Sequence, residues 1–170
     1  KMLVIADEAA DIHDYKSLAE YVFSNLNPAT DIYFSQGPMD VLDHSCSKMG
    51  FGGKMCIDGT KKMEEEIMDN GQWTMDDGQW TMDIEKIKKQ CSEIKNINAD
   101  LLKWNIPCLF LSVEKNHKQH IRQLNEALFQ LAEMQSIKMI LYVEHTVNVA
   151  DIANALWRFC NNLDPKRDHF

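Results

Sequence analysis

The sequence predicts an α/β fold, a layered sheet of mostly parallel strands with helices on its faces, in which one strand-helix unit is repeated. Apolar runs of strand length alternate with amphipathic helical stretches, which is the order of βαβ crossovers. Residues 1–31 also return, without a gap, as residues 138–168. The aligned identities are Lys1/Lys138, Met2/Met139, Asp14/Asp151, Asn25/Asn162, Leu26/Leu163, Pro28/Pro165 and Asp31/Asp168. A chain of 170 residues with 45% hydrophobic content can bury the core that such a fold needs.

The repeated unit begins with residues 2–6, an unbroken apolar run that suits a strand buried on both faces. An amphipathic helix follows, with one apolar stripe made of Tyr15, Leu18, Ala19, Val22, Phe23 and Leu26. The second copy repeats the spacing in Ile152, Ala155, Leu156, Phe159, Cys160 and Leu163. Asp14 and Asp151 precede these stripes and are predicted to cap the two helices. Pro28 and Pro165 prevent either helix from continuing.

The rest of the first half is less regular. Residues 31–35 predict a second short strand. Residues 37–62 hold five of the seven glycines and predict a long loop that adopts positive φ or approaches another group closely. Residues 61–68 can form a turn or two of helix. The hexapeptide GQWTMD then occurs twice, at 71–76 and 78–83, which fits either a flexible linker or an interface patch.

The second half returns to a regular order of elements. A helical step predicts a helix from residue 84 to residue 104, stopped by Pro107, with its face formed by Ile84, Ile87, Cys91, Ile94, Asn98 and Leu101. Residues 108–113 and 138–143 predict buried strands, and residues 118–133 predict a helix between them. We therefore expect three parts: a partial first copy (1–68), a Trp-containing linker (69–83), and a related α/β copy truncated at its end (84–170).

Charge and composition exclude several classes of function. A net charge of −8 and a pI near 5.2 argue against a nucleic-acid surface or an anionic membrane as the main partner. The sequence contains neither a membrane-spanning apolar run nor a leader, so we expect a cytoplasmic protein. Its five cysteines are an odd number without a CxxC pair, which favours free thiols. The ends of the repeat suggest a piece of a longer protein.

Acidic side chains follow the first strand, where open α/β sheets bind ligands. Asp7, Glu8 and Asp11 could hold a magnesium ion through oxygen ligands. A solvated loop beside a helix cap is the better interpretation, because the second copy has Glu144 and His145 in place of Asp7 and Glu8.

Two weaker patterns concern metal and phosphate binding. His117 and His120, three residues apart, could share a metal, but no carboxylate or cysteine nearby completes the ligands. Three glycines at 50, 52 and 53 before Lys54 superficially suggest a phosphate cradle, although the GxxxxGK[ST] order is absent. No serine or cysteine lies in a nucleophile elbow.

Three motifs are more specific: GPMDVLDHSCSKMGFGGKMCIDGTKK at residues 37–62, the opening KMLVIADEAADIHDY, and the turn NLNPATD. Together they strongly resemble the carboxyl-terminal domain of the UbiD family, whose members are prenylated-FMN-dependent decarboxylases of aromatic and α,β-unsaturated acids. The family signature falls at Gly53, Lys54, Met55, Asp58 and Thr60. The chain departs from it at three positions: it has Gly53 where the family has serine, Cys56 where the family has glycine, and Gly59 where the family has alanine. Residues 106–130 and 143–170 resemble the same domain, which implies a duplication.

The resemblance implies an assembly role. In the family, the flavin, its divalent metal and the catalytic residues belong to an amino-terminal domain without a counterpart here, so no catalytic, cofactor-binding or metal-binding position is carried over. The loop before the signature is implied to approach the active-site cleft, here through Leu42, His44, Ser45 and Met49. A loop-stabilising hydrogen bond explains the histidine and the serine equally well.

Two hypotheses follow. The first is the homo-oligomerising domain of a UbiD-like decarboxylase, inert alone, whose partner is the flavin-binding domain of the same polypeptide. Its parent enzyme acts on an aromatic or α,β-unsaturated acid, for example one of the 4-hydroxybenzoate type in quinone biosynthesis. The alternative is a free-standing acidic α/β module that binds a metal ion or a phosphorylated ligand. Neither involves nucleic acid or a membrane span.

Overall fold

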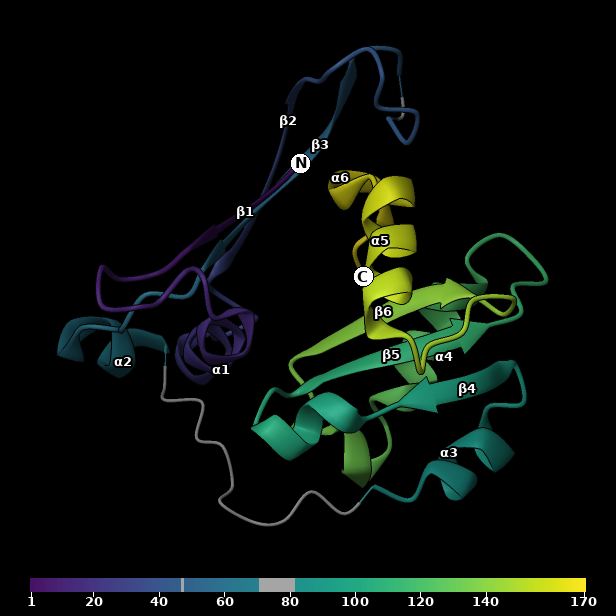
Figure 1. Cartoon of the computed structure of the whole chain (residues 1–170). Helices are drawn as coiled ribbons and strands as arrows, with labels where there is room; N and C mark the ends of the chain where they lie inside the picture. The colour runs from purple at the N-terminus through teal and green to yellow at the C-terminus, as the bar shows by residue number, and fades with distance from the viewer. Residues whose placement is uncertain (47, 71–81) are drawn as a thin grey trace. The chain divides into compact units, whose positions relative to one another are not determined.

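The computed structural model describes residues 1–46, 48–70 and 82–170, with side chains for all of these except 68–70. The chain forms two compact units. Unit 1 comprises residues 1–75, 104–106 and 161–169, and unit 2 comprises residues 76–103, 107–160 and 170. Figure 1 labels the elements of both, and each unit is described below by itself.

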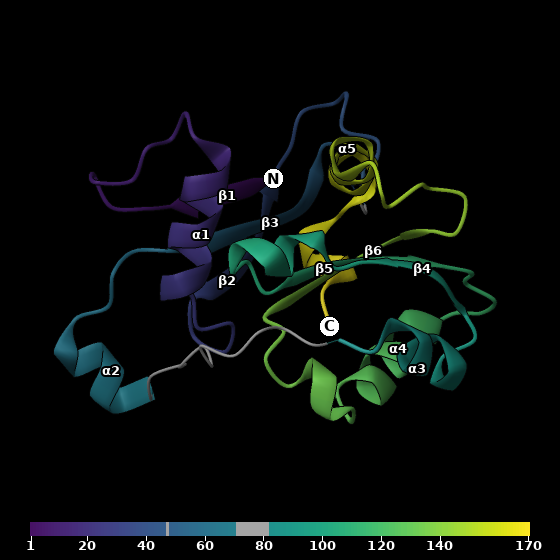
Figure 2. The same ribbon diagram turned by 60° about the horizontal axis from the view of Figure 1, so that its bottom comes forward.

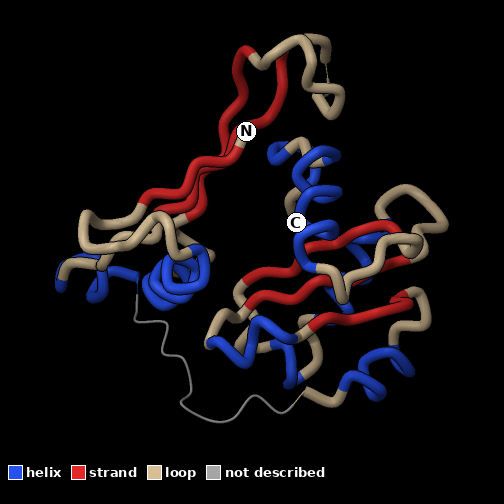
Figure 3. Tube along the Cα trace, viewed as in Figure 1, coloured by secondary structure: helices blue, strands red, loops and turns tan. Residues whose placement is uncertain are grey.

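Unit 1 is built on a mixed three-stranded sheet in the order β1-β3-β2. Its elements are β1 (Met2–Ile5), α1 (Tyr15–Asn25), β2 (Ile32–Pro38), β3 (Phe51–Asp58), α2 (Glu64–Asn70) and α6 (Pro165–Asp168). Strand β1 runs parallel to β3, with Met2 opposite Met55, whereas β2 runs antiparallel to β3, with Phe34 opposite Met55. Strands β2 and β3 form a long ribbon that the loop of residues 39–50 joins at its tip (Figure 3).

Unit 2 carries a second three-stranded sheet, in the order β4-β5-β6. Its elements are α3 (Ile84–Gln90), β4 (Ile94–Asn98), β5 (Cys108–Val113), α4 (His120–Leu128), the short 3-10 helix η2 (Ala132–Met134), β6 (Met139–Glu144) and most of α5 (Ile152–Asn162). A further 3-10 helix, η1 (Asp100–Trp104), follows β4. Strands β5 and β6 are parallel, and β4 pairs antiparallel with β5. Helices α3 and α4 cover one face of this sheet and α5 the other (Figure 2).

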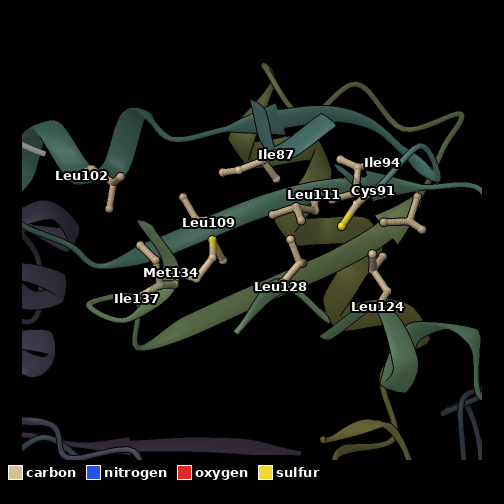
Figure 4. Close-up of a cluster of buried hydrophobic side chains, with 11 residues drawn as sticks. Ile87, Cys91, Ile94, Leu102, Leu109, Leu111, Leu124, Leu128, Met134 and Ile137 are labelled. Carbon is tan, nitrogen blue, oxygen red and sulfur yellow. The ribbon is translucent and has the colours of Figure 1, made fainter. Parts of the chain in front are cut away.

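The best-packed core lies between the sheet of unit 2 and helices α3 and α4 (Figure 4). Alternate residues of β5, Leu109, Leu111 and Val113, point into it. The intervening residues of β5 are buried as well, and Ala155 of α5 is fully buried. A strand covered on both faces needs an unbroken apolar sequence. The run CLFLSV supplies it, and this predicted buried strand is confirmed.

The internal repeat is visible in local hydrogen bonds. Helices α1 and α5 start and end at equivalent positions of the two copies. Asp14 caps α1 by accepting from the amides of Lys16 and Ser17, and Asp151 accepts from the Asn154 amide at 3.0 Å. The turns after the helices also match: Asp31 Oδ2 accepts from the Asn27 amide at 2.7 Å, and Asp168 Oδ2 from the Asp164 amide at 2.8 Å. The predicted caps are confirmed, and an ancestral duplication stays a prediction.

Three expectations about the sheets need correction. The fold is mixed α/β as predicted, but a mostly parallel sheet is not observed, because each sheet has one parallel and one antiparallel pairing. The expected burial of β1 on both faces is wrong: its four residues are each between 42% and 58% exposed. Strand β3 lies inside residues 37–62, where we expected a loop, although Gly50 does adopt a positive φ of 67°.

The predicted helix over 84–104 is also wrong. Helix α3 ends at Gln90, β4 occupies Ile94–Asn98, and η1 follows. The two buried ends of β4, Ile94 and Asn98, are four residues apart, a spacing that lies on one face of a helix and of a strand alike. The helix expected over 118–133 is the shorter α4. Three shorter predictions are confirmed. The strands predicted over 31–35 and 138–143 are β2 and β6, and the short helix predicted within 61–68 is α2.

Two further expectations concern the linker and the cysteines. The duplicated GQWTMD segment falls, except for residues 82 and 83, outside the described residues. The five cysteines are all free thiols, as the sequence predicted. Among the described residues, no helix combines the length and the apolar character that a bilayer crossing requires.

Candidate functional site

The carboxyl ends of the parallel strands β1 and β3 meet a group of side chains that we call the latch, made of Asp7, Tyr21, Asp58, Thr60 and Lys61. Asp7 Oδ2 accepts hydrogen bonds from the Tyr21 hydroxyl and, at 2.7 Å, from the Lys61 amide. These two bonds lower the pKa of the Asp7 carboxyl, and the first also raises the pKa of Tyr21. Asp7 therefore ties the segment after β3 to both β1 and α1.

Asp58, the last residue of β3, closes the turn that follows the strand. Its Oδ1 accepts from the Thr60 amide at 3.0 Å and from the Thr60 hydroxyl at 2.6 Å. The Lys62 ammonium lies 3.6 Å from Asp58 Oδ2 and 3.2 Å from Oδ2 of Asp31. Partial burial raises the pKa of Asp58, but the bonds from Thr60 and the charge of Lys62 outweigh it, so the pKa lies below its ordinary value. Carboxylates that are satisfied in this way stabilise a turn.

Gly59 completes the latch through close backbone approach. Its amide donates to the carbonyl of Ile5 at 2.9 Å, which extends the β1–β3 pairing by one bond. A Cβ at this position would lie 2.8 Å from both methyl groups of Val22, so α1 packs directly on the glycine backbone. The signature residues Asp58 and Thr60 thus act together with Gly59 to fasten the end of β3 to β1 and α1.

Neither metal site considered from the sequence is formed. Among residues 1–46, 48–70 and 82–170, no three His, Cys, Asp or Glu side chains are arranged to hold a metal ion. Asp7 is engaged in the latch. His120 is buried, its Nδ1 accepts from the Asn116 amide at 3.0 Å, and its Nε2 lies 3.3 Å from Glu93 Oε1. Both ring nitrogens are thus occupied, and His117 stacks on the ring at a centroid distance of 4.6 Å.

The loop of residues 39–50 is anchored by the first residue of the chain. The Lys1 ammonium pairs with Asp43 at 2.7 Å, donates to the Ser45 hydroxyl, and donates to the carbonyl of Leu163 at 2.7 Å. The bond from Lys1, helped by bonds from Ser45, lowers the pKa of Asp43 to about 2. Ser45 is therefore part of an anchor that fixes the loop.

The other predicted members of this loop lie at its surface. Met49 is 95% exposed and Leu42 is 76% exposed, and His44 is exposed as well. Their expected position beside an active-site cleft stays a prediction, since the cleft would belong to another domain.

The turn after α5 docks on strand β3 within unit 1. Asp164 is 1% exposed, and its Oδ1 accepts from the Gly53 amide at 3.0 Å and from the amides of Lys166 and Arg167. His169 stacks on Phe34 of β2 at a centroid distance of 3.8 Å. The glycines therefore do not form the suggested phosphate cradle, because Gly53 lies in strand β3 and its amide donates to the Asp164 carboxylate.

A shallow pocket of about 310 Å³ lies on the sheet of unit 1. Its walls come from the start of β1 and the middle of β2 and β3: Lys1, Met2, Leu3, Tyr33, Phe34, Ser35, Lys54, Met55 and Cys56. The signature residues Lys54 and Met55 thus line this pocket, whereas the signature residues Asp58 and Thr60 belong to the latch. The lining carries no paired acid and base within reach of each other, so it offers binding surface only.

Sequence reasoning missed three residues of these arrangements. Tyr21 was assigned to no role, Lys1 was noted only for the repeat, and Asp164 was not singled out. Asp164 bonds the Gly53 amide 111 residues away, and Lys1 bonds the Leu163 carbonyl 162 residues away. No local pattern reports such contacts. The sequence did place Tyr21 on the helix that follows the acidic loop, but the helical periodicity does not show that its hydroxyl donates to Asp7.

Comparison with known proteins gives a consistent picture. The family model described as 3-octaprenyl-4-hydroxybenzoate carboxy-lyase C-terminal domain matches residues 1–59 and 79–170. An uncharacterized protein of Helicobacter pylori strain J99 is 28% identical over 172 residues, covering 98% of this chain and 25% of its own length. An uncharacterized protein of Archaeoglobus fulgidus is 36% identical over 98 residues, covering 57% of this chain and 20% of its own. The chain therefore spans about a quarter or less of these relatives.

One solved structure is similar over part of the chain. It is the UbiD-class enzyme HmfF from Pelotomaculum thermopropionicum, in complex with FMN. The match has a TM-score of 0.36 and 22% identity, and it covers 52% of this chain and 19% of the other. A likeness of this size carries no argument about the arrangement of the elements.

Proposed function

Because the chain belongs to the family of 3-octaprenyl-4-hydroxybenzoate carboxy-lyase C-terminal domains, we propose that it is the assembly domain of a UbiD-like decarboxylase. The observation that carries the proposal is the exposed apolar sheet of unit 1. All four residues of β1 are large and apolar, and each is at least 42% exposed. Exposed large apolar side chains are the residues that interaction sites of soluble proteins use.

The charged groups of the chain support a structural role. The latch carboxylates are satisfied by Tyr21, Thr60, Lys62 and backbone amides. The most strongly shifted acid, Asp43, anchors a loop by its pairing with Lys1. A catalytic acid or base needs free access to its substrate and a pKa near the working pH. The pKa values of Asp7, Asp43 and Asp58 are all lowered and so lie further from neutral pH, which favours an inert domain whose parent performs the chemistry.

The parent enzyme would remove CO2 from an aromatic or α,β-unsaturated acid, of the 4-hydroxybenzoate type used in quinone biosynthesis. Prenylated FMN with a divalent metal would supply the electron sink in the parent's amino-terminal domain. The described residues of this chain do not fit either group, because they include no three-ligand metal cluster and their glycine-rich strand presents its Gly53 amide to Asp164. No step of decarboxylation is therefore assigned to these residues.

Sedimentation velocity across the micromolar range, combined with an absorbance spectrum, tests the proposal. We expect dimers or larger species without bound flavin. A matched variant, with Glu8 and Asp11 both replaced by alanine, should assemble like the parent sequence, because these two acids of the tip are not part of the latch and assembly does not use the tip as an ion site. A monomer at all concentrations would contradict the proposal. A monomer whose melting temperature rises with magnesium, and no longer does so in the double variant, would instead support a metal-binding module.

A further inference from the structure

The buried ring of His120 fastens a loop of unit 2 through one backbone hydrogen bond. His120 begins α4 and is 6% exposed. Its Nδ1 accepts from the Asn116 amide at 3.0 Å. Because a backbone amide only donates, Nδ1 carries no proton in this arrangement, and the ring is neutral with its proton on Nε2. This bond ties residues 115–119, which we call the histidine loop, to the start of α4.

The histidine loop is strained where it joins the helix. Gln119, the residue before α4, has a φ of 68°, in the left-handed region that residues with a side chain rarely adopt. Its side chain makes no capping hydrogen bond, and the first turn of α4 has no acidic residue. Such a backbone persists only where neighbouring contacts hold it. The bond between Asn116 and His120 spans Gln119 and is one of these contacts.

Charged and titratable groups on the elements around the ring act on its charge. Glu93, in the turn before β4, lies 3.3 Å from Nε2 and favours a charged ring. The stacked His117 opposes a charged ring whenever it is itself protonated, and the amino end of α4 opposes it as well. Lys95 and Glu114 pair at 2.8 Å and so largely offset each other. The further groups on these elements, on the histidine loop and after β6 are Cys91, Lys115, Lys118, Arg122 and His145.

From this arrangement we infer that protonation of His120 opens the histidine loop, so that unit 2 carries a pH-sensitive switch at the start of α4. The second proton binds at Nδ1, which then meets the Asn116 amide donor against donor. The Nε2 side keeps its character, since Nε2 donates toward Glu93 in both states. Acid therefore breaks the bond on the Nδ1 side, and Gln119 becomes free to leave the left-handed region.

The direction of the switch follows from proton binding. The closed loop accommodates only the neutral ring, whereas the open loop accommodates the neutral and the charged ring. The open state therefore binds more protons, and its population rises as the pH falls. Histidine side chains change charge between about pH 5 and 8, so we expect the opening in that range. A charged His117 stacked on the ring acts in the same direction, because like charges repel.

Amide hydrogen exchange of the full chain, followed by NMR from about pH 8 to about pH 5, tests the switch. We expect the protection of the Asn116 amide, corrected for the intrinsic pH dependence of exchange, to fall at least about tenfold toward the lower pH. The fall should follow the titration of the His120 ring, which nitrogen NMR records in the same samples. Protection that stays constant while the ring titrates, or a ring that stays neutral over the whole range, would overturn the inference.

The matched control is His120→Asn. Its Oδ1 takes the place of Nδ1 as the acceptor for the Asn116 amide but does not titrate in this range. Protection of that amide should then change by less than about twofold between the two pH values. A fall as large as in the parent sequence would assign the effect to another group and refute the role of His120. Circular dichroism shows whether the variant is folded.

A second variant tests the switch even if the control does not fold. Glu93→Gln keeps an acceptor beside Nε2 and removes its charge. We expect the opening to move to lower pH, because the charged ring loses the carboxylate that favours it. An opening that does not move would mean that His120 is not the group that titrates. Because all of these residues belong to unit 2, the inference is independent of the proposed assembly function, and either can fail alone.

Discussion

Replacing Gly53 by alanine should release the turn that follows α5 from strand β3. A Cβ at position 53 would lie 2.2 Å from Asp164 Oδ1 and 2.3 Å from the Lys166 amide nitrogen. These atoms belong to a carboxylate and a backbone segment that are themselves held by hydrogen bonds. No rotamer change of a flexible side chain relieves the contact, so the turn itself must move.

The cost can be estimated from two contributions. Forcing extra atoms into a packed site costs about 1–3 kcal/mol. Losing the hydrogen bond from the Gly53 amide to the buried Asp164 carboxylate costs about 1.5–3 kcal/mol more, because the acceptor is charged. Partial relaxation makes the two overlap, and we expect a loss of about 3 kcal/mol in the free energy of unfolding of unit 1.

Urea unfolding, followed by circular dichroism, measures this loss. The matched control is Gly37→Ala on the neighbouring strand, where a Cβ would meet only the flexible end of Lys54 at 3.3 Å. The control should change stability by less than about 1 kcal/mol. The amide resonances of Lys166 and Arg167 should also shift in the alanine variant, because both amides donate to the Asp164 carboxylate that the added Cβ displaces. If Gly53→Ala were as stable as Gly37→Ala, the docking of the turn on β3 would be refuted.

Three further outcomes are expected. The Lys1–Asp43 pair should stabilise the fold by about 1–2 kcal/mol above pH 3.8, because the Asp43 pKa is lowered from 3.8 to about 2, and the contribution should vanish as the pH falls through that range, as acid unfolding would report. Leu111→Ala should cost about 2–5 kcal/mol in denaturant unfolding, because its side chain is completely buried in the core of unit 2. Nitrogen NMR should find the proton of neutral His120 on Nε2, facing Glu93, since Nδ1 accepts a backbone hydrogen bond.

Each of these outcomes has a control. Asp43→Asn should remove this pair's share of the acid dependence of stability, while the other carboxyls with lowered pKa values, such as Asp7 and Asp58, keep theirs. An unchanged pH profile would contradict the role of the pair. Leu42→Ala, in the exposed loop, should be neutral within about 0.5 kcal/mol. A proton on Nδ1 of His120 would mean that the bond from the Asn116 amide is absent in solution.

The elements that sequence patterns located correctly are those with dense local signals. Strand β5 has six apolar or small residues in a row, a run that suits a strand covered on both faces, and all six are buried. Helices α1 and α5 each combine a capping aspartate with an apolar stripe and a following proline. These features depend on neighbours within a few residues, and the caps at Asp14 and Asp151 follow from the same local chemistry.

The candidate site was found only in part. The acidic tip and the signature residues were singled out from sequence motifs, but the motifs did not show that Asp7 accepts from Tyr21 and Lys61. A carboxylate after a strand looks the same in a sequence whether it binds a metal or fastens a loop. The distinction needs the positions of the donors around it, and α1 supplies one of them from 14 residues away.

The sequence by itself determined the alternation of helices and strands, the internal repeat and the family. Tertiary structure decided which strands are covered and what the glycines are for. Strand β1 has the composition of a buried strand, yet it lies at the edge of its three-stranded sheet with its four side chains about half exposed, because burial depends on which elements cover it. Position 53 of strand β3 is a glycine because Asp164, 111 residues further along the chain, occupies the space that a side chain would fill. Contacts of that range leave no local pattern, since they form only when the chain has folded.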